Sequence, residues 1–240
     1  MRELPPWASG PGEILKHGLD LLDDDNDTNR RLAMIAIDNS VELIVKTYLG
    51  LPKRITELAI SRKEYQEISE SFPALLDALE KHASEKIIGI DLGAIEWYHR
   101  LRNQLYHQGN GLTVERENVE VYAALANELF HKLYGVILVR PKSDKAKLLA
   151  EFLKNWTILE TEMHNMAWES SLTGVPDKGF GFAFKFMRNA GVIPEEEQRK
   201  LKYFQQIRNK IVHEHRQNED LLTKEIVLDF KKFVDKYRPK

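Results

Sequence analysis

The chain has 240 residues, of which 42% are hydrophobic and 30% charged, with a formal net charge of −2. This profile is typical of a globular, mostly helical protein, and its near-zero net charge excludes a general binder of polyanions. Cysteine is absent, which excludes a disulfide framework, a thiolate nucleophile and a cysteine-based zinc site. No apolar run approaches the roughly 18 residues that a membrane span needs, and residues 1–12 lack the apolar core of a signal peptide. We therefore expect a cytoplasmic protein without a membrane partner.

The N-terminal segment predicts a first helix over residues 13–22, followed by the acidic run 23–27. Asp at alternate positions is also found in calcium-binding loops. Such a loop needs Gly and Glu where this chain has Thr28 and Met34. We interpret the run as a solvated turn that caps the next helix.

Residues 30–49 predict a long helix with apolar residues around much of its circumference, the central element of a first core. Glu42 lies on this helix and could reach the motif described below, but we expect it at the surface. Residues 61–83 predict another amphipathic helix, broken near Phe72 and Pro73 because proline disfavours helix in the residue before it.

Further helices complete the prediction, and no strand is predicted, so the expected fold class is all-α. Helices are expected over 92–108 and from an N-cap at Thr113 to about 139, followed by a linker at 140–143. The second half predicts helices over 144–170, 195–215 and 222–237, with a loop at 174–181 and a short aromatic helix or irregular segment around 180–186.

The strongest feature of the sequence is a heptapeptide that occurs twice. It reads Leu-Arg-Asn-Gln-Leu-Tyr-His at residues 101–107 and Ile-Arg-Asn-Lys-Ile-Val-His at residues 207–213. Composition alone predicts about 0.02 matches to Arg-Asn-x-x-x-His in this chain. The repeat indicates an internal duplication, and we expect two domains, residues 1–140 and 141–240. Their net charges are −6 and +4, so an RNA ligand would rely on the second domain for positive charge.

Each heptapeptide is predicted to lie on a helix, because the apolar residues in and before it recur at steps of three and four. On such a helix Asn103 and His107 share a face, as do Asn209 and His213. Each Arg lies about 100° away from its Asn, and its length allows it to reach back toward the His. Gly109 indicates that the first motif helix ends directly after the motif.

The repeated motif near a helix end, followed by a polar loop and one more amphipathic helix, resembles the HEPN superfamily (higher eukaryotes and prokaryotes nucleotide-binding domains). The segment Ala-Ile-Asp-Asn-Ser-Val-Glu-Leu at residues 36–43 is also similar to members of that family. The resemblance implies two tandem up-and-down helical bundles, the second shorter, that could form a pseudo-dimer. Many members are metal-independent ribonucleases whose active site lies across the interface of two such domains. Other members keep the fold without the activity.

The residue types in the motif suit chemistry on a phosphodiester. A guanidinium binds phosphate oxygens in a planar fork, and a His that titrates near neutrality can exchange a proton with an RNA 2′-hydroxyl or a leaving 5′-oxygen. Asn can orient the His or donate to phosphate. No cofactor and no metal are required. The candidate catalytic residues are Arg102, Asn103, His107, Arg208, Asn209 and His213.

Two functions follow from these residues. The first is a metal-independent endoribonuclease that cleaves RNA by 2′-hydroxyl attack at a site built from both motifs. The alternative is a non-catalytic helical module that uses the motifs as structure and binds a protein or a nucleotide. A role in toxin–antitoxin systems, defence or RNA processing, with a protein regulator or antitoxin as partner, rests on the resemblance alone. A homodimer and an internal pseudo-dimer both stay open.

The remaining histidines carry weaker signals. A subgroup of HEPN toxins has a modified Tyr two residues after the motif His, but this chain has Gly109 and His215 there, so that form of regulation is not expected. His213 and His215 lack a third metal ligand at a suitable spacing. Five others are predicted to be surface or packing residues: His17, His82, His99, His131 and His164.

Overall fold

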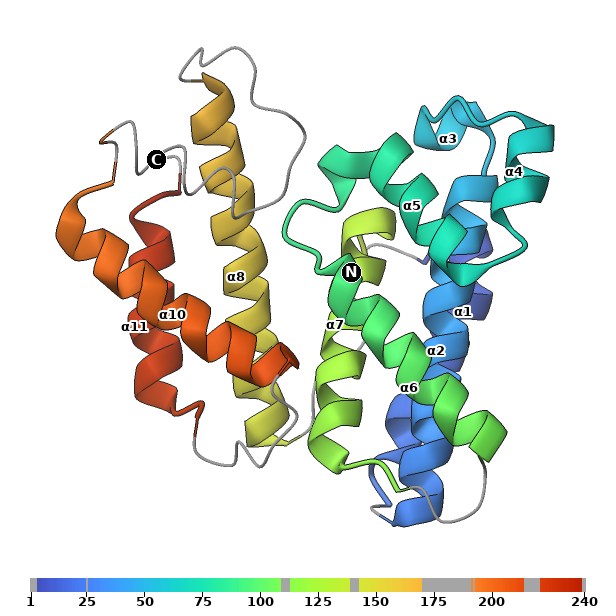
Figure 1. Cartoon of the computed structure of the whole chain (residues 1–240), viewed down its shortest axis with the longest axis horizontal. Coiled ribbons are helices and arrows are strands. Elements are labelled where there is room, and N and C mark those ends of the chain that lie inside the picture. The colour runs from blue at the N-terminus through green and yellow to red at the C-terminus, as the bar shows by residue number, and fades with distance from the viewer. Residues whose placement is uncertain are drawn as a thin grey trace. The chain divides into compact units, whose positions relative to one another are not determined.

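The computed structural model describes residues 4–24, 26–108, 113–138, 143–169, 191, 193–213 and 221–238. All regular structure within these ranges is helical, which confirms the all-α prediction. The chain divides into two compact units, Met1–Arg140 and Pro141–Lys240. Each unit is a group of helices with its own core (Figure 1).

The first unit is arranged around α2 (Asp27–Gly50), as the sequence predicts for its central helix. Four longer helices pack against α2 or its neighbours. They are α1 (Ser9–Leu21), α5 (Phe72–Ala83), α6 (Leu92–Gln108) and α7 (Arg116–Tyr134). Shorter elements are α3 (Lys53–Thr56), α4 (Arg62–Ile68) and the 3-10 turns Pro6–Ala8 and Ser84–Lys86.

The contact between α1 and α2 is close because a glycine faces α2. A Cβ added to Gly18 would lie 2.9 Å from Cγ1 of Ile37 and 3.2 Å from its backbone nitrogen. Backbone atoms cannot move aside as a side chain can, so this position admits no larger residue without separating the helices. The Ser40 hydroxyl also donates to the carbonyl of Pro11 at 2.7 Å within the buried interface. These contacts hold α2 in place, and α2 in turn carries part of the site described below.

Capping residues set several helix boundaries, and two of them agree with the predictions. The acidic run does supply the cap of α2, since the Asn26 side chain accepts from the backbone N–H of Asn29 at 2.9 Å. The predicted break of the helix over 61–83 near Phe72 and Pro73 is also confirmed, because Ser71 caps α5 through the N–H of Ala74. Thr113 is not an N-cap: Glu115 occupies that position and α7 begins one residue later.

The C-terminal end of α7 was also predicted too late. The helix ends at Tyr134 rather than near residue 139, because Gly135 adopts a left-handed conformation with φ 72° and its N–H bonds to the carbonyl of His131 at 2.8 Å. Glycine reaches this conformation without the steric cost that other residues meet there.

The second unit contains α8 (Asp144–Glu169), α10 (Glu195–His213) and α11 (Lys224–Asp235). Its core is aromatic, with the rings of Phe152 and Phe204 centred 4.8 and 4.6 Å from that of Phe230. The predicted loop at 174–181 and aromatic segment at 180–186 lie outside the described residues, as does most of the linker at 140–143.

Both heptapeptides lie at the C-terminal end of a helix that is followed by one more helix in the same unit. The first closes α6, with α7 after it, and the second closes α10, with α11 after it. This placement confirms the prediction made from the repeat. None of the helices in the described part of the chain is both long and apolar enough to span a membrane.

A polar contact ties the start of α10 to the residues after α11. Glu197 accepts from Nζ of Lys236 at 2.8 Å and from the hydroxyl of Tyr237. The hydrogen bond from Lys236, followed by that from Tyr237, lowers the pKa of the Glu197 carboxyl below its ordinary value. Burial, together with the bond to Glu197, raises the pKa of the Tyr237 hydroxyl.

We predict that Glu197→Gln destabilises the protein at neutral pH and not in acid. A carboxyl whose pKa is lowered on folding stabilises the folded state above its unfolded pKa of about 4.3, and the stabilisation is lost as pH falls through the folded pKa. The urea midpoint of the variant should therefore be lower than that of the wild type between pH 5 and 8, by the small amount that corresponds to the free energy of one surface ion pair. The two midpoints should converge below about pH 4. Glu195→Gln is the control, because its 3.6 Å contact with Arg199 is highly exposed. A gap between Glu197→Gln and wild type that persists in acid would contradict the assignment.

Candidate functional site

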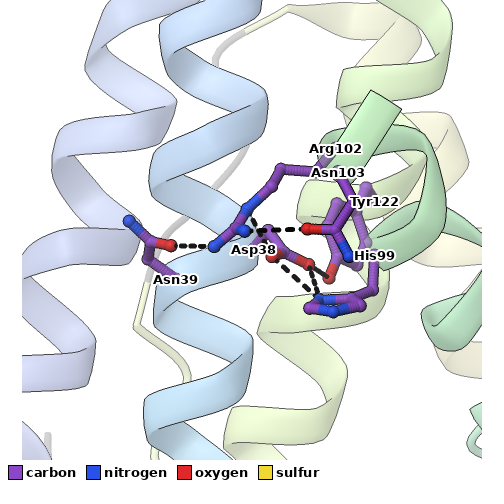
Figure 2. Close-up of polar contacts among 6 residues, drawn as sticks. All are labelled: Asp38, Asn39, His99, Arg102, Asn103 and Tyr122. Carbon is purple, nitrogen blue, oxygen red and sulfur yellow. Dashed lines mark hydrogen bonds and ion pairs between the residues drawn. The ribbon is translucent and has the colours of Figure 1, made fainter. Parts of the chain in front are cut away.

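The first motif is attached to a buried carboxylate on α2. The side chain of Asp38 is fully buried, and three side chains from two other helices surround it (Figure 2). The Tyr122 hydroxyl of α7 donates to Oδ1 at 2.7 Å. Nε of Arg102 lies 2.8 Å from Oδ2. Burying a carboxylate away from water is costly unless it is paired and hydrogen-bonded, and these contacts meet both conditions.

His99 is the third group around this carboxylate. Its Nδ1 lies 3.1 Å from both oxygens of Asp38. An ionised carboxylate only accepts hydrogen bonds, so His99 must carry its proton on Nδ1, whether or not Nε2 is protonated as well. Phe72 stacks on the ring with centroids 4.2 Å apart. The prediction that His99 is a packing residue is confirmed by this stacking, and His99 also belongs to the polar network around Asp38, which the prediction did not include.

Burial changes the pKa of the Tyr122 hydroxyl, which donates to Asp38. Desolvation, followed by the charge of Asp38, raises the pKa of Tyr122 well above its ordinary value. The ring of Tyr122 also stacks on that of Tyr98, with centroids 4.8 Å apart, and burial raises the pKa of Tyr98 too. Tyr122 is therefore a permanent hydrogen-bond donor to Asp38 over the physiological pH range.

Each of the three guanidinium nitrogens of Arg102 has one side-chain partner. Nε pairs with Asp38, at a direction poorly aligned for a hydrogen bond. Nη1 donates to Oδ1 of Asn103 at 2.9 Å, and Nη2 donates to Oδ1 of Asn39. The side chain keeps 17% of its surface exposed. Because Nη1 and Nη2 each carry two N–H groups, one donor on each nitrogen is not used by these partners.

His107 lies apart from this network. It is exposed at the end of α6, and its ring packs edge-on against the neighbouring Tyr106 with centroids 5.4 Å apart. The Arg102 guanidinium carbon lies 6.0 Å from the Tyr106 ring centroid. In the first motif, Tyr106 is thus a neighbour of both the Arg and the His.

The second motif has a different arrangement of the same residue types. Nη1 of Arg208 lies 3.0 Å from Nε2 of His213 and 3.3 Å from Oδ1 of Asn209. A guanidinium has donors and no acceptor, so a hydrogen bond between these two nitrogens requires Nε2 of His213 to accept. The predicted reach of the Arg back to the His is present here. In the first motif, Arg102 instead turns toward Asp38.

Six residues were predicted as catalytic. Within the first unit Arg102 contacts Asn103, while His107 packs against Tyr106. Within the second unit Arg208 contacts Asn209 and His213. The motif pattern did not identify Asp38, Asn39 or Tyr122 as part of the site. A signal for Asp38 was present in the sequence. It lies four residues after Met34 and three before Val41, within the buried face of α2, and a carboxylate on such a face requires a positively charged or hydrogen-bonding partner. Glu42, the acidic residue considered instead, is only half-buried.

Comparison with protein-family models, with curated proteins and with solved structures gave no match to this chain. Within the described residues, no group of three or more His, Asp or Glu side chains is arranged to hold a metal ion.

We predict that Asp38→Asn lowers the free energy of unfolding by about 3–5 kcal/mol, because removing one partner of a buried ion pair leaves the other uncompensated. Chemical denaturation measured by circular dichroism checks this. Asp77→Asn, at an exposed position on α5, is the matched control and should change stability by about 0.5 kcal/mol or less. Equal stability of Asp38→Asn and the wild type would show that the network does not hold α6 against α2.

Proposed function

We propose that the protein is a metal-independent endoribonuclease of the HEPN type, in which both motifs take part in cleavage. The observation that carries the proposal is the contact between Arg208 and His213 at the end of α10, in a motif that recurs at the end of α6. An imidazole held beside a guanidinium combines a group that can accept a proton with a group that binds phosphate.

The proposed reaction uses the nucleophile that RNA itself carries. One His accepts the proton of a 2′-hydroxyl as its oxygen forms a bond to the adjacent phosphorus. The bond from phosphorus to the 5′-oxygen breaks, and a second, protonated His donates a proton to that oxygen. The products are a 2′,3′-cyclic phosphate and a 5′-hydroxyl. His107 and His213 are the proposed proton-transfer residues.

The arginines would bind the phosphate as negative charge grows on its oxygens. Arg102 is suited to this role because Asp38, Asn39 and Asn103 hold its guanidinium while two N–H donors stay available. A fixed guanidinium loses less conformational entropy on binding than a free one. Asn209, next to Arg208, would orient the guanidinium of the second motif.

A non-catalytic module is the second candidate, and the engagement of Arg102 by a buried carboxylate favours it, because such a network also serves as a structural link between helices. On that reading the motifs are retained as parts of the fold and the protein binds a protein or a nucleotide. The two candidates differ in what the exposed histidines do, since His107 and His213 contribute little to packing.

We predict that His107→Ala and His213→Ala each reduce RNA cleavage by about 10²–10⁴-fold, the usual contribution of a general acid or base. The measurement is gel-resolved cleavage of total RNA with EDTA present, which should leave the wild-type activity intact. His17→Ala, an exposed histidine on α1, is the control and should cleave normally. DNA should not be cut because it lacks the 2′-hydroxyl. Undiminished cleavage by both motif variants, or absence of cleavage by the wild type, would favour the module.

A mixing experiment distinguishes how the two histidines act together. If both belong to one chain, His107→Ala and His213→Ala proteins are each inactive and stay inactive when mixed. If they come from different chains of a dimer, mixing restores activity. If each motif pairs with its own copy in a second chain, each variant alone keeps part of the activity. The proposal that both motifs are needed for one reaction is contradicted by the third result.

A further inference from the structure

The first motif contains an aromatic side chain that the chemistry described above does not use. Tyr106 is 66% exposed, the largest exposed fraction among the large hydrophobic side chains that the described part of the chain leaves at the surface. Leu105, its neighbour, is buried. The exposure of Tyr106 therefore places an aromatic ring in solvent at the end of α6.

The surroundings of Tyr106 are those of the candidate site. The ring lies 6.0 Å from the guanidinium carbon of Arg102 and 5.4 Å from the ring of His107. Both distances are within the reach of a single nucleotide. Arg102 is itself fixed by Asp38, so the ring has a positively charged and positioned neighbour.

The same position in the second motif is different. Val212 takes the place of Tyr106 and is 1% exposed. The aromatic surface is therefore present in the first motif and absent from the second, although Arg, Asn and His occur in both. This difference indicates that the two motifs have unequal parts in substrate binding.

We propose that Tyr106 stacks on an unpaired nucleobase of single-stranded RNA and thereby places the adjoining phosphate beside Arg102 and His107. The inference rests on the proposed ribonuclease function and assigns its substrate class. Aromatic side chains bind unstacked bases through their faces, and a duplex does not offer such a base. Arg102 provides the charge for the phosphate. The second motif, with Arg208 beside His213, then contributes mainly to proton transfer.

The test measures binding without cleavage, so that it does not depend on activity. The probes are a fluorescent single-stranded oligoribonucleotide with 2′-O-methyl groups throughout, which lacks the nucleophile, and single-stranded DNA of the same sequence. Fluorescence anisotropy compares the wild type with Tyr106→Leu and Tyr106→Phe. Tyr203→Leu is the control, because Tyr203 is a half-exposed tyrosine on α10, 48% accessible.

Tyr106→Leu should weaken binding of both single-stranded probes by about 5- to 150-fold, the usual effect of losing one base–aromatic stack. Tyr106→Phe keeps the ring and should bind as the wild type does, and Tyr203→Leu should do the same. Binding of a duplex RNA should not change in Tyr106→Leu. In the cleavage assay Tyr106→Leu should raise KM more than it lowers kcat.

The outcomes separate this inference from the proposed function. Cleavage by the wild type with equal probe binding by Tyr106→Leu overturns the inference and leaves the ribonuclease in place. Tyr106-dependent binding of single strands without any cleavage supports the stacking role and overturns the ribonuclease. Failure of the wild type to bind either single-stranded probe overturns the inference, as does an equal loss of duplex binding in Tyr106→Leu. A loss in Tyr106→Phe as large as in Tyr106→Leu also overturns it, because the ring would then not be the binding group.

Discussion

The buried carboxylate of Asp38 is the interaction on which the first unit depends. It joins three helices, since Asp38 lies on α2, Arg102 and His99 on α6, and Tyr122 on α7. A carboxylate in this position is tolerated only while its partners stay in place. The network therefore fixes the direction in which α6 leaves the core, and with it the positions of the motif residues at the end of that helix.

The two motifs therefore differ in the contacts of their Arg residues, although their sequences match at Arg, Asn and His. In the first, Arg102 is held by a side chain from another helix, and the exposed end of the motif carries Tyr106 and His107. In the second, Arg208 contacts His213 within its own helix. A duplication that begins with two equal sites can diverge in this way, because a change in a packing partner redirects a long side chain such as Arg without altering the motif itself.

Local patterns accounted for most of the helices. The predicted ranges of α6 and α8 agree with the structure closely, because a single apolar face repeats through each of them. The boundaries that failed are those decided by single capping residues. Both belong to α7, which begins after Glu115 rather than after Thr113 and which Gly135 ends early. Such caps depend on one or two hydrogen bonds. They therefore leave a weaker signal in the sequence than the apolar residues that recur along a whole helix.

The sequence by itself determined the helical class, the existence of the repeat and the location of each motif at a helix end, because all three depend on residues that are near one another in the chain. The tertiary structure decided the rest. Asp38 and Arg102 are 64 residues apart, so their pairing exists only once α6 has packed on α2. The contrast between exposed Tyr106 and buried Val212 has the same origin. Both residues precede the motif His in an identical pattern, and only the packing around each helix end determines which side chain meets solvent.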